Sequence, residues 1–168
     1  MQISYKVVPI FIALGALMLI TSSVPFAQAL DIQSQVRITS TAGTCGLTVD
    51  GGAPINYGTL TNLQVSGEQR LVFTNTGTAD GAISVSGTHW SGGGPTGGST
   101  VMLVSDTHFT PSLGSSYDEM AALQLNDQPA SILAPQEQNS IFWRLTPHIA
   151  DASFAGDAIQ TVRLTATC

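Results

Sequence analysis

The chain has 168 residues, of which 43% are hydrophobic and only 10% are charged, and its formal net charge is −6 at pH 7. The single lysine, Lys6, lies in the first 29 residues, so the remainder carries four arginines against eleven acids, a net charge of −7. Nucleic acid and anionic lipid both require clustered cations on their protein partners. This composition therefore argues against both partners.

The first 29 residues have the pattern of a cleaved signal peptide. Lys6 supplies a positive charge, Val7 to Ile20 form an apolar run of 14 residues, and Ala27-Gln28-Ala29 places small side chains where signal peptidase reads them. The run is shorter than the roughly 20 residues of a membrane-spanning helix, and a retained anchor is the alternative. We expect cleavage to leave residues 30–168 as one secreted or cell-surface domain without a stable membrane span.

Two cysteines, Cys45 and Cys168, remain in that domain. An even number of cysteines without a redox motif, in an exported chain, is typical of a structural disulfide. We therefore expect a bridge between Cys45 and Cys168, with two free thiols as the alternative.

Short segments with alternating apolar and polar residues follow one another along the chain, as in strands with one buried face. In the first, Asp31 to Thr41, the apolar residues Ile32, Val36 and Ile38 share one side. Further strands are expected at 45–49, 55–60, 70–74 and 82–87, and Asn75-Thr76-Gly77 supplies the turn between the last two.

The second half of the chain continues this pattern. Strands are expected at 100–105, 131–133, 140–146 and 159–168, with a glycine-rich loop before them and a polar loop at 108–117. The segment 117–125 fits either one helical turn or a short strand. About seven to nine short strands with hardly any helix signal predict an all-β, immunoglobulin-like antiparallel β-sandwich.

No catalytic or metal-binding motif is present in the sequence. The three histidines, His89, His108 and His148, lack the spacing of metal ligands, and neither a Gly-x-Ser-x-Gly nor a His-Glu-x-x-His segment occurs. We therefore expect a protein that is not an enzyme and that has no metal and no cofactor.

Two kinds of ligand stay open as alternatives. Trp90, next to the glycine-rich loop, could stack on a sugar ring or pack inside the sandwich. Carboxylates of the loops could bind calcium; the candidates are Asp118 and Glu119 with Asp127, or Asp151 with Asp157. The corresponding function is a monomeric, surface-displayed binding module for carbohydrate or calcium.

Residues 55–60 (INYGTL), Gly67-Glu68 and residues 73–80 (FTNTGTAD) resemble the turn motifs of camelysin/TasA-like secreted proteins. These are β-sandwich subunits of extracellular fibres in bacteria, with relatives among archaeal bundling pili. The segment 143–147 is similar to the closing strands of many surface immunoglobulin-like domains. The resemblance implies a structural subunit of an extracellular filament or cell-surface layer, which associates with itself or with other surface proteins.

The first strand is also a candidate donor strand for such an assembly. Its residues 36–41 (VRITST) echo residues 162–167 (VRLTAT), so both segments present the same pattern to a sheet. The strand precedes the segment that the disulfide would close. It is either the first strand of its own domain or is donated to a neighbouring subunit, where Ile32, Val36 and Ile38 would fill pockets.

Export with cleavage after Ala29 is directly testable. Intact-mass analysis of the secreted protein should find Leu30 at the N-terminus, because the signal peptidase site ends at Ala29. A membrane-bound product that still starts at Met1 would contradict this prediction.

Overall fold

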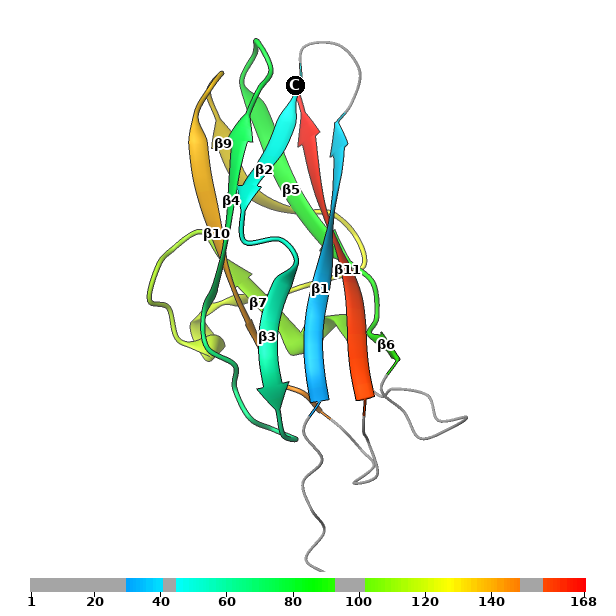
Figure 1. The fold of residues 1–168 in the computed structure, drawn as a ribbon. Helices are drawn as coiled ribbons and strands as arrows, with labels where there is room; N and C mark the ends of the chain where they lie inside the picture. Colours follow the sequence, from blue (N-terminus) through cyan, green and yellow to red (C-terminus); the bar gives the residue numbers. More distant parts are fainter. Residues whose placement is uncertain (1–29, 41–44, 93–101, 149–155) are drawn as a thin grey trace, which may run out of the picture.

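The computed structural model describes residues 30–40, 45–92, 102–148 and 156–168, and these form two β-sheets packed face to face (Figure 1). Within these residues there are eleven strands and two short 3-10 helices, η1 (Val104–Asp106) and η2 (Tyr117–Glu119). The six-stranded sheet has the order β3 (Ile55–Leu60), β1 (Leu30–Ser40), β11 (Gly156–Thr167), β5 (Gly81–Gly87), β9 (Gln128–Leu133), and β6 (Ser91–Gly92) pairs with β11. The five-stranded sheet has the order β2 (Leu47–Gly51), β4 (Gln69–Asn75), β10 (Gln138–Leu145), β7 (Thr107–Thr110), β8 (Ala121–Ala122).

The all-β sandwich predicted from the sequence is confirmed. Alternate residues of each long strand face the space between the sheets, as the period of two requires. In β11 the inward residues Val162, Leu164 and Ala166 are at most 1% exposed. Across the core, Phe73 on β4 and Trp143 on β10 are fully buried. The two short strands β6 and β8 span only two residues each and are too short to give a sequence signal.

The first and last strands pair in parallel, whereas the sequence predicted an antiparallel sandwich. All eleven residues of β1 lie beside β11, and the other ladders between the described strands are antiparallel. The register places Val36 opposite Val162 and Ile38 opposite Leu164. The echo between 36–41 and 162–167 therefore reflects two strands that run side by side in the same direction.

The predicted strand at 100–105 is wrong over its described part. Val104–Asp106 form η1 instead, and β7 follows inside the segment predicted as a polar loop. The Asp106 carboxylate accepts the Leu103 backbone N–H at 2.9 Å and caps the turn. Met102, just before η1, and Val104, its first residue, are both buried in the core. The proposed signal peptide lies outside the described residues, and among the described ones no helix is long and apolar enough to cross a membrane.

A buried polar network crosses the sandwich. The side-chain oxygen of Gln160 on β11 accepts hydrogen bonds from Ser34 on β1 at 3.1 Å and from Thr107 on β7 at 3.0 Å. Its amide nitrogen donates to the Thr88 carbonyl at 2.9 Å, and Trp90 donates its ring N–H to Thr107 at 3.2 Å. Since Ser34, Thr107 and Gln160 are fully buried, each must find its partners inside the protein.

Replacing Gln160 by methionine tests this network. The Gln160→Met variant keeps the side-chain length but leaves the hydroxyls of Ser34 and Thr107 without their acceptor, so it should lose about 2–4 kcal/mol of unfolding free energy. Gln35→Met, on the exposed face of β1, is the matched control and should change stability by about 0.5 kcal/mol or less. Urea unfolding measures both, and equal losses in the two variants would refute the role of the network.

Candidate functional site

Strand β1 has an open edge over its second half. Its pairing with β3 runs only from Leu30, opposite Leu60, to Ser34, opposite Ile55. Residues 35–40 pair with β11 alone, so half of their backbone N–H and C=O groups have no ladder partner among the described residues. Ile38 in this stretch is 41% exposed. The upper part of β1 in Figure 1 therefore forms a free margin of the six-stranded sheet.

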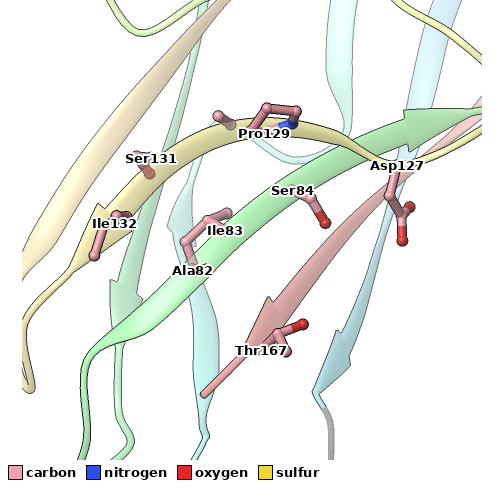
Figure 2. Close-up of a pocket in the computed structure, with 9 residues that line it drawn as sticks. Ala82, Ile83, Ser84, Asp127, Pro129, Ser131, Ile132 and Thr167 are labelled. Atoms are coloured by element: carbon pink, nitrogen blue, oxygen red, sulfur yellow. The ribbon is translucent and has the colours of Figure 1, made fainter.

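Strand β9 is the opposite edge of the same sheet and, among the described strands, pairs only with β5. Ile132 on this strand is 75% exposed and lies at a groove of about 520 Å³ between β9, β5 and the end of β11. Pro129 fits an edge strand because proline has no N–H to donate to a ladder. Figure 2 shows Pro129, Ser131 and Ile132 along β9 beside Ala82, Ile83 and Ser84 of β5.

The two open edges run in the same direction. Strand β9 is antiparallel to β5, β5 is antiparallel to β11, and β11 is parallel to β1. It follows that β1 and β9, at opposite sides of one sheet, are parallel. A second copy of the chain could therefore place its β9 beside the β1 margin without being inverted, and the new ladder would be parallel.

The outer face of this sheet carries a row of charged and polar residues. Arg37 lies opposite Arg163, and Arg163 lies opposite Ser86. Asp127 completes the row, since its Oδ1 accepts hydrogen bonds from Ser86 at 2.7 Å and from Arg163 at 3.1 Å. The hydrogen bond from Ser86, followed by the contact with Arg163, lowers the pKa of Asp127, so this carboxylate is ionised at neutral pH.

The three candidate donor-strand residues all lie in the chain's own sheet. Ile32 is 1% exposed and belongs to the core, Val36 packs against the core while half-buried, and Ile38 is 41% exposed at the open margin. Within one chain, β1 thus fills the position between β3 and β11 itself. Donation of this strand to a neighbour stays a prediction.

The predicted disulfide between Cys45 and Cys168 is present, with the two Cα atoms 5.7 Å apart. Cys45 precedes β2 in the five-stranded sheet, and Cys168 follows β11 in the six-stranded sheet. The bridge therefore ties the two sheets together at the end of the sandwich where the β1 margin lies.

The histidines lie in separate contacts. His89 accepts the Val104 N–H at 3.2 Å, His108 stacks on Tyr117 with ring centres 3.8 Å apart, and the Nδ1 atom of His148 is 3.0 Å from Oδ1 of Asp106. In the described part of the chain, no three His, Cys, Asp or Glu side chains gather as a metal site would require.

The candidate calcium and sugar residues are placed as follows. Asp127 belongs to the row already described, and the Glu119 carboxylate accepts the backbone N–H of Ser116 at 3.0 Å and its hydroxyl at 2.9 Å. Asp151 lies outside the described residues. Trp90 is only 4% exposed. It therefore packs inside the sandwich and does not offer its ring to a sugar.

No family model matches the chain, and no curated protein matches it. The candidate site, the two open strand edges, is therefore argued from the geometry of the sheet alone. Sequence reasoning missed the β9 edge and the role of Asp127 in the row. Pro129 inside a strand was the available signal for an edge, whereas the distance between Asp127 and Arg163 in the sequence hid their contact.

Removing the disulfide should destabilise the fold without changing it. In the chain-entropy model, a bridge across a separation of 123 residues stabilises the folded state by at most about 5 kcal/mol. Urea unfolding of a Cys45→Ala/Cys168→Ala variant should show a much lower midpoint than the wild type. An unchanged midpoint, or two alkylatable thiols in the native wild-type protein, would contradict the prediction.

Proposed function

We propose that the protein is an exported, non-enzymatic structural subunit of an extracellular filament or cell-surface layer, whose copies join edge to edge. The observation that carries this proposal is the pair of open edges, residues 35–40 of β1 and β9, on opposite sides of one sheet. The resemblance of the turn motifs to camelysin/TasA-like fibre subunits points to the same function.

Open strand edges are templates for another strand, and monomeric proteins usually block them. Charged side chains are frequent blocking residues; the open stretch of β1 carries one, Arg37, and β9 carries none. An isoleucine is exposed at each edge, Ile38 on β1 and Ile132 on β9. Pro129 removes one backbone N–H near the start of β9. The backbone groups of residues 130–133 remain able to pair with another strand.

A contact between two different edges is heterologous, so each added copy exposes a new free edge. Such a contact does not close on itself unless the rotation between copies completes a ring, and it therefore generates a filament or an extended array. Because β1 and β9 run in the same direction, every copy would keep the same orientation. Backbone hydrogen bonds would provide affinity, and Ile38 and Ile132 would add apolar area.

Exchange of β1 between copies is a second route to the same assembly. An exchanged β1 would make the same contacts with β3 and β11 of a neighbour that it makes with its own chain, as in domain swapping. This is the donation considered for Ile32, Val36 and Ile38.

A monomeric carbohydrate-binding module is the second candidate function. A hollow of about 590 Å³ beside β8 and β9 is lined by amide and carboxylate side chains, which hydrogen-bond sugar hydroxyls well; they include Glu119, Gln124, Asn126 and Gln128. A sugar-binding chain that stays monomeric at all concentrations would favour this candidate over assembly.

Lysine substitutions at the two edges test the proposed assembly. Wild-type mature protein should form filaments or arrays at micromolar concentration, as seen by electron microscopy and sedimentation velocity. Ile38→Lys or Ile132→Lys should each abolish growth, because a charged edge residue blocks strand pairing. Leu113→Lys, at a loop position that is 75% exposed, is the matched control and should assemble like the wild type.

Mixing the two blocked variants adds a sharper test. The Ile38→Lys chain keeps its β9 edge and the Ile132→Lys chain keeps its β1 edge, so the mixture should form heterodimers and stop there. A monomeric wild type would refute the proposal. If Ile38→Lys still assembles while a folded chain lacking residues 30–41 does not, strand exchange rather than edge pairing is the route.

A further inference from the structure

Arg37 is the one member of the polar row that lacks a partner among the described residues. It stands opposite Arg163, and like charges in this position destabilise a sheet. Arg163 is neutralised by Asp127 at 3.1 Å, but no hydrogen bond or ion pair joins Arg37 to the rest of the described chain. As far as the described ranges extend, the row therefore ends at the β1 margin in a guanidinium with no carboxylate partner.

The opposite end of the same row carries an unused acceptor. Both hydrogen bonds to the Asp127 carboxylate use Oδ1, and its Oδ2 atom makes no hydrogen bond or ion pair with the described residues. The Asp127 side chain is 40% exposed and directly precedes β9. Within the described residues, one sheet thus presents an unpaired guanidinium near its β1 margin and an unpaired carboxylate oxygen at its β9 edge, on the same face.

The alignment of these two groups follows from the register. Arg37, Arg163 and Ser86 are successive Cα partners across β1, β11 and β5, and Gln128 is the partner of Val85, which places Asp127 beside Ser86. All four residues stand at one level across the sheet. A neighbouring copy that adds its β9 to the β1 margin without sliding along the strands brings its Asp127 next to Arg37, and this register sets residues 128, 129 and 131 of its β9 level with Ile38, Thr39 and Ser40.

We infer that Arg37 of one copy binds the Asp127 carboxylate of the next, and that this ion pair sets the register of the edge-to-edge contact. The inference rests on the proposed function. An opposite-charge pair across two strands is favourable where a like-charge pair is not, and a slip by one residue would turn the two groups to opposite faces. The contact would join the polar row of one copy, which ends at Arg37, to the polar row of the next, which begins at Asp127.

The mixed variants provide a single interface in which to test the pair. In the heterodimer of Ile38→Lys and Ile132→Lys chains, the contact uses Arg37 of the Ile132→Lys chain and Asp127 of the Ile38→Lys chain. Arg37→Gln on the Ile132→Lys chain should weaken the heterodimer about three- to tenfold at low salt. The same substitution on the Ile38→Lys chain, where Arg37 lies outside the contact, is the internal control and should leave the dissociation constant unchanged.

Asp127→Asn provides the reciprocal test, because asparagine keeps an oxygen for Ser86 and Arg163 but has no charge. It should weaken binding only on the Ile38→Lys chain, and combining it with Arg37→Gln across the contact should weaken binding little further, as for two residues of one interaction. The difference between wild type and Arg37→Gln should vanish at about 1 M salt.

The outcomes separate the inference from the proposed function. A heterodimer that forms but ignores Arg37→Gln overturns the ion pair and leaves edge-to-edge assembly standing. An effect of Arg37→Gln that is equal on either chain also overturns it, since the residue would then act through the fold. The absence of any heterodimer refutes both.

Discussion

The parallel pairing of β1 with β11 is the contact on which the rest of the structure depends. It joins the first and last strands along eleven residues. It also makes β1 the second strand of the six-stranded sheet, between β3 and β11. Pairing strands so distant in sequence is costly in chain entropy. The disulfide between Cys45 and Cys168 reduces that cost by closing most of the domain in the unfolded chain as well.

Hydrophobic alternation alone leaves the relative position of the two sheets undefined, and the buried network around Gln160 supplies a more specific constraint. Its hydrogen bonds with Ser34 and Thr107 connect β1, β11 and β7, which belong to different sheets. A slip of β1 by one residue would remove Ser34 from the core and leave the Gln160 oxygen with one partner fewer. Buried polar groups are costly when unpaired, so the network favours the observed register.

The same parallel ladder creates the open margin. Strand β3 covers β1 only up to Ser34, whereas β11 continues to Ser40, so no described strand pairs with the other side of residues 35–40. At the far side, β9 ends the sheet. Because the intervening strands reverse direction an even number of times, both margins are parallel. The proposed edge-to-edge contact, and the proposed pairing of Arg37 with Asp127, depend on this parallel arrangement of the two margins.

The sequence by itself determined the all-β class, the inward faces of the main strands and the cysteine pair, because these follow from local alternation and from a count of residues. The similarity between 36–41 and 162–167 was also visible, but not that it reflects parallel neighbours. Only the tertiary structure decided which edges are open, that η1 replaces a strand at 104–106, and that Arg37 and Asp127 share a row. Strand order and register depend on contacts between residues far apart in the chain, and a periodicity of two carries no information about which strands those are.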